Sequence, residues 1–514
     1  MQKNQITAFA TLCAAAALPF LTLADFNKTS NVDYGLLLFY GLGLIVVAFA
    51  AIFLIKLAAP RLPLERLCYA AAVFLVLLFS YDLFATTIKS LKSSPRLSLV
   101  VGIWAVVTAA AVAASYIWSK RREGTLIIFT VIAVMTALPA AKLIVFHAPH
   151  LLARDRSDGG QRAASDLKSR PNIYYFILDG YGRADKIKEL LNFDNSKFID
   201  GLRERGFFVA DKGTANYPST WLSIASTMSE RYVQTPDMPP YRSILAFHKT
   251  MKGKNAAVET LQRNGYKYVY VANGHFYYQC PGFEDHCIEG RNSRPFFQPT
   301  EINLLKSTPA YDIILKYYPD LIIQPFLKSL AQVADVADAI VNVPLQKPYY
   351  VYAHLLVPHP PFVLDAECQR TGNTNINLRG WFELPIKGYT DYLQCVNKQM
   401  TELLDRILSK DPDALIVIQG DHGTSFFLDW RKPLKDWSKR GVSERLAPLN
   451  AMRLPAQCRD TLYPTMSLIN TFPAIFACLE HKKPSYLPDI SYISPDTNNP
   501  EFGHVLRVDP YAGN

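Results

Sequence analysis

Long apolar stretches dominate the first 150 residues of this 514-residue chain. They cover residues 6–24, 34–58, 67–88, 97–119 and 125–146. A helix that spans a bilayer needs about 20 apolar residues, and all five stretches come close to or exceed that length. Five such stretches in succession are too many and too long for buried helices of a soluble protein. The pattern therefore predicts an N-terminal α-helical transmembrane bundle of about five helices over residues 1–150.

The first apolar stretch has two interpretations. Lys3 followed by an apolar run is typical of the start of a signal peptide. The run ends in Leu21-Thr22-Leu23-Ala24, which only weakly resembles a small-residue cleavage site. We interpret the stretch as a retained membrane helix. Cleavage would leave the orientation of the remaining chain unchanged.

Beyond a polar linker at residues 151–170, the pattern changes to short apolar runs between amphipathic segments. The runs predict strands at 172–178, 207–210, 266–271, 349–356 and 413–418, and the segments predict helices at 184–192, 195–205, 255–264 and 388–409. Apolar strands that alternate with helices are typical of a parallel sheet buried on both faces. We therefore expect an α/β sandwich with a mostly parallel central sheet over residues 171–514.

The charge of the chain bears on its orientation in the membrane. The formal net charge is +10, and much of the excess lies in short loops between apolar stretches, which fits membrane topology better than nucleic-acid binding. The second and fourth loops are basic and should be cytoplasmic: Lys56, Arg61 and Arg66, and Lys120, Arg121 and Arg122. The third loop, with Lys89, Lys92 and Arg96, is the one exception to this topology. The resulting orientation places the domain after residue 150 on the extracytoplasmic or periplasmic side of the cell membrane.

The cysteines agree with this placement. Two lie in membrane spans, Cys13 and Cys68, and the six others lie in the outer domain: Cys280, Cys287, Cys368, Cys395, Cys458 and Cys478. An even number of cysteines in an oxidising compartment indicates disulfide bonds. Cys280 and Cys287 are close enough to close a small loop, whereas the sequence does not pair the other four. A cysteine zinc site is the alternative, but no C-x-x-C spacing occurs.

Polar residues follow several predicted strands at their C-terminal ends, where open α/β sheets hold ligands. Asp179 follows the strand at 172–178, His359 follows the strand at 349–356, and Asp421-His422 follows the strand at 413–418. A carboxylate beside an imidazole suits zinc or manganese. His354, inside its strand, is also explained as a core residue, and His275, in the loop after residues 266–271, is also explained as a surface residue.

A candidate nucleophile lies in the stretch Asn216–Ala225. Tyr217-Pro218 favours extended backbone, and the apolar spacing that follows predicts a helix. Thr220 is thereby placed at the helix N-terminus, where free amide groups and the helix dipole favour a negative oxygen. The alternative role of this hydroxyl is that of a helix cap. Ser219 and Ser223 are the alternative nucleophiles.

As an ordered set, these residues resemble the alkaline phosphatase/sulfatase superfamily over about residues 170–480. When Thr220 is placed on the cysteine of the sulfatase motif C-x-P-S-R, Ser223 falls on its serine and Arg231-Tyr232 on a later Arg-Tyr pair. Leu222 and Ile224 replace the motif proline and arginine.

A threonine at position 220 limits the resemblance to certain subgroups of the superfamily. Sulfatases convert their cysteine or serine to formylglycine, and a threonine cannot give that aldehyde. A threonine nucleophile resembles nucleotide phosphodiesterases, lipoteichoic acid synthases and phosphoethanolamine transferases. The last two share the layout of five membrane helices followed by an extracytoplasmic catalytic domain.

The resemblance implies roles for individual residues. The implied metal ligands are Asp179, Thr220, Asp421 and His422, which would hold a divalent ion, zinc or manganese first and magnesium or calcium as alternatives. Thr220 would also be the nucleophile. His354 and His359 resemble an H-x4-H pair whose histidines contact the substrate phosphate or protonate the leaving group. His275 is a third candidate for substrate binding.

The expected function is transfer of a phospho-alcohol headgroup, phosphoethanolamine or phosphoglycerol, from a phospholipid to an envelope glycan or lipid. Two alternatives stay open on the sequence alone. One is a hydrolase of the same family: a phosphodiesterase or phosphatase first, and a sulfuric ester hydrolase after these. The other is a non-catalytic membrane scaffold with a decayed enzyme fold.

Overall fold

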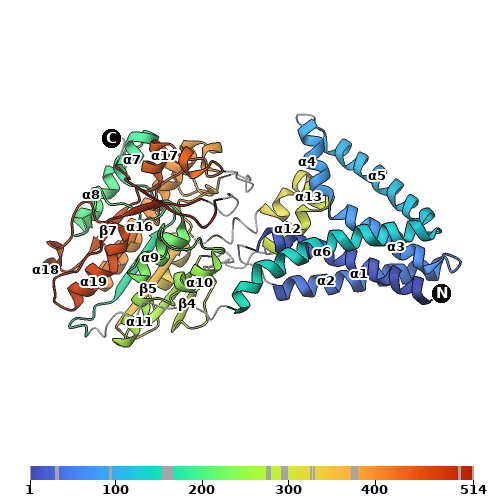
Figure 1. Cartoon of the computed structure of the whole chain (residues 1–514). Helices are drawn as coiled ribbons and strands as arrows, with labels where there is room; N and C mark the ends of the chain where they lie inside the picture. The colour runs from blue at the N-terminus through green and yellow to red at the C-terminus, as the bar shows by residue number, and fades with distance from the viewer. Residues whose placement is uncertain are drawn as a thin grey trace. The chain divides into compact units, whose positions relative to one another are not determined.

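The chain divides into two compact units. The computed structural model describes residues 2–28, 34–91, 95–152, 166–273, 279–290, 299–323, 327, 330, 332–371, 380–495, 499 and 501–511. The helical unit comprises Met1–Arg156 and Phe296–Gln324, and the sheet unit comprises Ser157–Pro295 and Pro325–Asn514 (Figure 1). The sequence led us to expect one continuous outer domain over 171–514, but the segment 296–324 groups with the helical unit.

The helical unit contains the predicted membrane spans. Its long helices are α1 (Gln2–Phe26), α2 (Tyr34–Ala58), α5 (Leu97–Trp118) and α6 (Arg122–Leu152). The predicted span at 67–88 is broken into α3 (Leu64–Leu78) and α4 (Tyr81–Leu91), which meet at a bend of 51°. Among the described residues, four helices are long and apolar enough to cross a membrane, or five if the bent pair forms one span.

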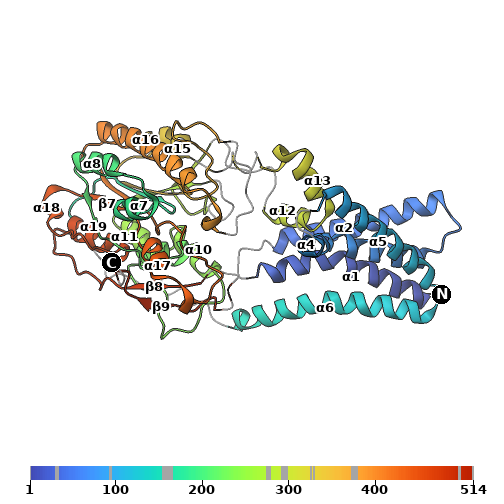
Figure 2. The same cartoon turned by 90° about the horizontal axis from the view of Figure 1, so that it is seen from above.

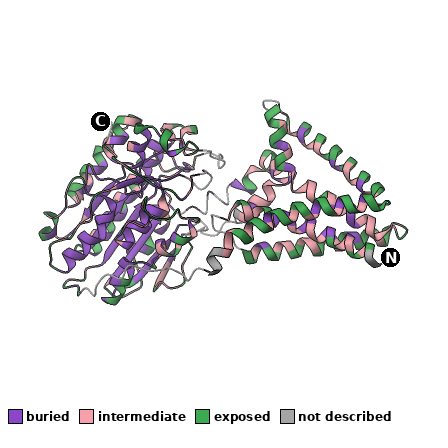
Figure 3. Cartoon of the chain, in the orientation of Figure 1, coloured by how far each residue is buried: buried purple, intermediate pink, exposed green. Residues whose placement is uncertain are grey.

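The two units differ in where their apolar side chains lie. Helices of the helical unit expose many large apolar side chains. Figure 3 shows many exposed residues, in green, along the ribbons of these helices. On α2, for example, Leu38 is 64% and Phe39 70% exposed. Such surfaces are stable in hydrocarbon but costly in water, because apolar area in water is unfavourable. The exposure pattern therefore fits a membrane bundle.

The sheet unit contains a seven-stranded sheet in the order β2-β7-β6-β1-β5-β3-β4. The strands are β1 (Ile173–Leu178), β2 (Phe208–Val209), β3 (Lys267–Ala272), β4 (His286–Glu289), β5 (Tyr349–Leu355), β6 (Leu415–Gln419) and β7 (Asn450–Arg453). The β6, β1, β5, β3 and β4 pairings are parallel, and β7 runs antiparallel to both neighbours. The predicted, mostly parallel α/β fold is confirmed, whereas β4 and β7 were not predicted.

Helices cover the sheet, and a small two-stranded sheet lies beyond it (Figure 2). The helices of this unit are α7 (Ala184–Leu191), α8 (Ser196–Glu204), α9 (Thr220–Ser229), α10 (Leu245–Met251), α11 (Ala256–Arg263), α15 (Val333–Val341), α16 (Ile386–Lys410), α17 (Lys439–Arg445), α18 (Ala456–Arg459) and α19 (Thr471–Leu479); the small sheet is β8 (Ser491–Ile493) with β9 (Leu506–Val508). Side chains of β1, β3 and β5, such as Tyr175, Tyr268 and Tyr352, share one core cluster with apolar residues of α9 and α19. This packing fixes the start of α9 against the sheet.

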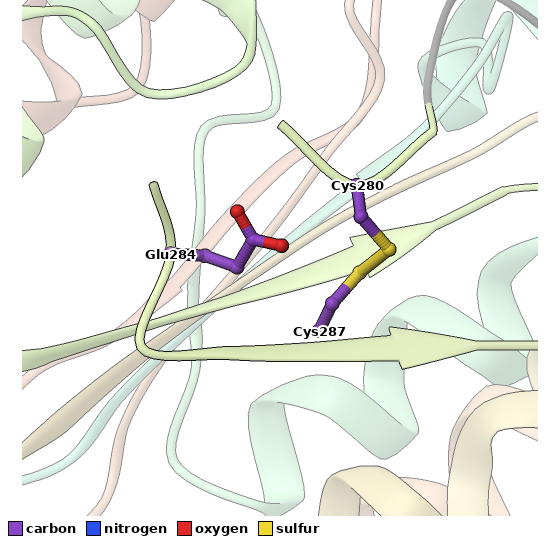
Figure 4. A group of neighbouring side chains, drawn as sticks. All are labelled: Cys280, Glu284 and Cys287. Atoms are coloured by element: carbon purple, nitrogen blue, oxygen red, sulfur yellow. A yellow bond between two sulfur atoms is a disulfide. The ribbon is translucent and has the colours of Figure 1, made fainter. Parts of the chain in front are cut away.

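The structure pairs the six outer cysteines. Cys280 and Cys287 form the predicted disulfide, and Cys368–Cys395 and Cys458–Cys478 are two further pairs. Figure 4 shows Glu284 beside the first bridge. These three side chains have the spacing of a metal site, but the two sulfurs are bonded to each other. Since a metal binds the thiolate, the bridge explains this group as a disulfide rather than a zinc site.

Candidate active site

Two neighbouring parallel strands carry the acidic residues of the site. β1 and β6 pair with Ile177 opposite Gln419, so both strands end at the same edge of the sheet. Asp179 follows β1 directly, and Asp421 follows β6 after one glycine. The Gly180 amide donates a hydrogen bond to Asp421 Oδ1 over 3.1 Å. This bond joins the two strand ends and fixes one oxygen of Asp421.

Four side chains converge at this edge: Asp179, Thr220, Asp421 and His422. His422 Nε2 lies 3.2 Å from Thr220 Oγ1, 3.2 Å from Asp421 Oδ2 and 3.5 Å from Asp179 Oδ1. Asp179, Asp421 and His422 are buried and are spaced as metal ligands. In a tetrahedral zinc site with bonds of about 2.1 Å, ligand atoms lie roughly 3.4 Å apart. The observed separations fit such a site.

Two carboxylate oxygens strengthen this assignment. Asp179 Oδ1 and Asp421 Oδ2 are buried and have no hydrogen-bond partner among the described residues. A buried polar atom without a partner costs roughly 1–3 kcal/mol, and more when it is charged. Both atoms face the same imidazole nitrogen, so a cation bound by all three atoms would satisfy them together.

The electrostatics of the acidic pair point the same way. Burial raises the pKa of Asp421, and the neighbouring Asp179 carboxylate raises it further, to about 7. Burial also acts to raise the pKa of Asp179, but the neighbouring His359, the hydrogen bond with His354 and the neighbouring His422 outweigh it and hold this pKa below its usual range. Two carboxylates this close repel each other in a buried site, and a divalent cation between them would remove that repulsion.

His422 is held in the tautomer that a metal ligand needs. Its Nδ1 lies 3.0 Å from the Gly423 carbonyl oxygen, which can only accept a hydrogen bond, so Nδ1 carries the proton. The unprotonated Nε2 then faces the cluster. Burial and the nearby Arg445 guanidinium lower the pKa of His422, which keeps the imidazole neutral. A backbone carbonyl that orients a ligating histidine is common in metal sites.

The helix α9 places Thr220 in the cluster, as predicted from its spacing. α9 begins at Thr220, and the preceding Ser219 makes no side-chain cap; its hydroxyl lies 3.4 Å from that of Ser494. Ser223 donates its hydroxyl proton to the Asp421 carbonyl over 2.6 Å. Of the three candidate hydroxyls, Thr220 is therefore the one whose oxygen lies beside His422 Nε2.

The three predicted substrate histidines have different environments. His354 is fully buried in β5, and its Nε2 lies 3.3 Å from Asp179 Oδ2, so it can orient that carboxylate; its contact with substrate stays a prediction. His359 is half-buried; its Nδ1 donates to the Pro360 carbonyl over 2.6 Å, which leaves Nε2 as the acceptor. The centroid of its ring lies 5.3 Å from the centroid of the Trp381 ring, and the two rings pack edge to face. His275 lies outside the described residues.

Other residues at the site carry no sequence signal of their own. Gly180 has a φ of +70°, and a Cβ there would lie 2.6 Å from the Trp381 ring, so the turn after β1 requires glycine. Arg445 donates to the carbonyls of Pro218 and Gly423 over 2.7 and 3.2 Å. It thus braces the turn before α9 against the loop after His422. These contacts join segments far apart in the chain, which spacing within one motif does not reveal.

Comparisons with known proteins place this geometry in context. The family model described as Sulfatase matches residues 171–442, which is more than half of the chain. A search of curated proteins found no match. Similar solved structures include the lipooligosaccharide phosphoethanolamine transferase A (EptA) from Neisseria meningitidis, with 13% identity and a TM-score of 0.40, covering 92% of this chain and 95% of that one.

Two periplasmic domains are also similar. The C-terminal periplasmic domain of EcEptC from Escherichia coli, in complex with Zn, has 13% identity and a TM-score of 0.38, covering 69% of this chain and 95% of that one. The C-terminal periplasmic domain of the phosphoethanolamine transferase EptC from Campylobacter jejuni has 13% identity and a TM-score of 0.39. The match covers 67% of this chain and 99% of that one.

Proposed function

The chain belongs to the sulfatase family, and on this premise we propose that it is a membrane enzyme that transfers phosphoethanolamine or phosphoglycerol from a phospholipid to an envelope glycan or lipid. One observation carries the proposal: the Thr220 hydroxyl, at a helix N-terminus, lies 3.2 Å from a neutral imidazole nitrogen that also meets two buried carboxylates. A hydroxyl needs activation to act as a nucleophile, and this arrangement supplies ligands for an activating cation.

Four residues would hold one divalent ion: Asp179, Thr220, Asp421 and His422. Carboxylate and imidazole ligands suit zinc and manganese. When bound, such an ion lowers the pKa of a neighbouring hydroxyl and stabilises negative charge on phosphoryl oxygens. His354 and the Gly423 carbonyl would keep Asp179 and His422 in position.

In the first half of the proposed reaction, Thr220 Oγ1 releases its proton to water and attacks the phosphorus of the donor phosphodiester. A bond from Oγ1 to phosphorus forms as the bond from phosphorus to the diacylglycerol oxygen breaks. That oxygen takes up one proton, which His359 Nε2 is assigned to accept from water and to deliver. Amide groups in the first turn of α9 have no intrahelical partner and are assigned to bind phosphoryl oxygens.

In the second half, a hydroxyl of the acceptor attacks the phospho-threonine. Its proton passes to His359 Nε2, which returns it to water. The bond from phosphorus to Thr220 Oγ1 breaks, and Oγ1 takes up a proton from water, which restores the threonine hydroxyl. Water in place of the acceptor would give hydrolysis. The helical unit supports transfer, because an enzyme anchored in the bilayer meets a lipid donor at high effective concentration. The threonine opposes sulfatase chemistry, since it cannot give the aldehyde nucleophile.

Mass spectrometry of the tryptic peptide 213–231 tests the proposal. Full-length protein loaded with zinc is incubated with vesicles of phosphatidylethanolamine or of phosphatidylglycerol and then digested. We expect one of the two lipids to leave its phospho-alcohol on Thr220 and to release diacylglycerol. The adduct should be absent from Thr220→Ala and present in Ser219→Ala, since the Ser219 hydroxyl is directed to Ser494.

The outcomes separate the alternatives. An adduct that disappears only when a glycan or lipid acceptor is added supports transfer. Release of free phosphoethanolamine or phosphoglycerol without an acceptor would identify a hydrolase. No adduct and no diacylglycerol with either lipid, from protein that retains its zinc, would contradict the proposal.

A further inference from the structure

The chain leaves the sheet unit after residue 295 and re-enters it at residue 325, and the segment between belongs to the helical unit. This segment forms α12 (Pro299–Lys306), α13 (Pro309–Tyr317) and the 3-10 turn η2 (Pro319–Leu321). Both Figure 1 and Figure 2 show α12 and α13, in yellow, beside α4. We call residues 299–321 the return hairpin. Neither the sequence motifs nor the active site accounts for it.

The first half of the return hairpin packs on the ends of two spans. Leu304 of α12 joins an apolar cluster with Phe20 of α1 and Leu37 of α2. The Tyr40 hydroxyl of α2 donates a hydrogen bond to Glu301. These contacts combine apolar packing with a polar bond, so α12 is seated on the bundle.

The second half completes the broken span. The amide of Tyr81, the first residue of α4, donates to the Ser307 carbonyl over 3.2 Å. Asp312 of α13 accepts from the Tyr81 hydroxyl over 3.2 Å and pairs with Lys89 over 3.4 Å. Backbone groups freed by a helix break at membrane depth must be satisfied by protein, because lipid offers no partner. The return hairpin supplies that partner at the bend.

The contacts also fix the depth of the return hairpin. α2 has 25 residues, so it is about 38 Å long and exceeds a hydrocarbon core of about 30 Å by roughly 4 Å at each end. Tyr40 follows the start of α2 at Tyr34 by six residues, which is about 9 Å along the axis. It therefore lies near the outer boundary of the hydrocarbon. The loop basicity places this end of α2 on the outer side.

Four large apolar or aromatic side chains of the return hairpin are exposed. Ile313 is 38%, Tyr317 60%, Tyr318 63% and Leu321 58% exposed. The Lys316 ammonium lies 5.2 Å from the centre of the Tyr317 ring. Tyrosine is enriched at membrane interfaces, and a lysine beside it can keep its charge in the headgroup layer while its stem covers apolar surface.

We propose that the return hairpin is an interfacial anchor whose face of Ile313, Tyr317, Tyr318 and Leu321 contacts phospholipids of the outer leaflet. The depth of its contacts and the aromatic, basic character of its surface favour a lipid partner. The chain therefore passes between the two units after residues 156, 295 and 324. This inference does not depend on the chemistry proposed at Thr220.

Photocrosslinking tests the proposal. Benzoylphenylalanine is introduced singly at positions 317, 318 and 321 of the full chain, and the protein is irradiated in vesicles of phosphatidylethanolamine and phosphatidylglycerol. We expect lipid adducts in a yield comparable to that at Phe39, which is exposed on α2, and several-fold above that at Tyr511, which is exposed in the sheet unit. Three positions on one face keep the test intact if one variant does not fold.

Two results would overturn the anchor. Adducts between these positions and other peptides of the same chain would show that the face is an internal protein interface. Adducts no more frequent than at Tyr511, while Phe39 reacts with lipid in the same vesicles, would place the face in water.

Discussion

Asp179 and Asp421 illustrate how single residues reveal the chemistry of this site. Both carboxylates are buried against one neutral imidazole nitrogen, and each has an oxygen without a hydrogen-bond partner among the described residues. Without a cation, this arrangement costs free energy through desolvation and repulsion. With a cation, the same atoms become ligands. The residue pair should therefore stabilise the metal-loaded protein and destabilise the metal-free one.

Asp421→Asn should change stability in opposite directions in these two states. In metal-free protein the amide removes a negative charge, keeps an oxygen for the Gly180 amide and can donate to His422 Nε2. We expect the free energy of unfolding to rise by about 1 kcal/mol. In zinc-loaded protein, the stabilisation by zinc should be lost with the bound metal. Thermal unfolding in chelator and in zinc, with metal analysis, measures both effects.

Asp411→Asn is the matched control for this substitution. Asp411 is also buried, but it pairs with Lys347 at 2.9 Å and accepts from Asn172 at 2.5 Å. Its replacement should destabilise the protein equally with and without zinc. If Asp421→Asn destabilised the metal-free protein as Asp411→Asn does, the acidic pair would not be a preformed metal-binding site.

At the scale of elements, local sequence patterns predicted the main strands, the positions of their ends and the start of one helix. The apolar runs marked β1, β5 and β6, and their ends located Asp179 and Asp421-His422, because parallel strands of one sheet end at one edge. Proline and helical spacing located the start of α9. The short strands β4 and β7 were missed because they have few residues and weak alternation.

Structural features that depend on contacts between residues far apart in the chain could not be predicted from the sequence. The brace of Arg445 depends on carbonyls more than 20 and more than 200 residues away in the chain. The return hairpin has ordinary amphipathic helices, and nothing in its own residues indicates that it packs on the membrane spans. The span at 67–88 is continuous in hydropathy, yet it bends at residues 79–80. Next to this bend, the Ser307 carbonyl of the return hairpin accepts a hydrogen bond from the Tyr81 amide.

The disulfides should differ in their effect on stability. Cys458–Cys478 joins α18 to α19, closes 20 residues and is buried in the main core, whereas Cys280–Cys287 closes 7 residues at its margin. Loop entropy alone favours the longer bridge by about 1 kcal/mol. We expect the Cys458→Ser/Cys478→Ser variant to unfold at a lower temperature than Cys280→Ser/Cys287→Ser. Equal losses, measured at the same zinc saturation, would contradict this ranking.

At the scale of the whole molecule, charge and cysteine usage favour one orientation. The three disulfides are all in the sheet unit, and the two free cysteines lie in the spans α1 and α3. Disulfides form in oxidising compartments, which agrees with an extracytoplasmic sheet unit. The third loop breaks the positive-inside rule through Lys89, Lys92 and Arg96. The structure reduces the uncompensated positive charge of this loop, because Lys89 forms an ion pair with Asp312 of the return hairpin.

The orientation itself is the last prediction. A reporter that folds only in an oxidising compartment should be active when fused after Asn514 and inactive when fused after Arg61, in the basic second loop. A fluorescent protein that matures in the cytoplasm should give the reverse pattern at the same two positions. The physical reason is that basic residues next to a span are retained on the cytoplasmic side. Cytoplasmic fluorescence from the fusion after Asn514 would reverse the topology, and with it the outer-leaflet position of the return hairpin and the access of the sheet unit to an envelope acceptor.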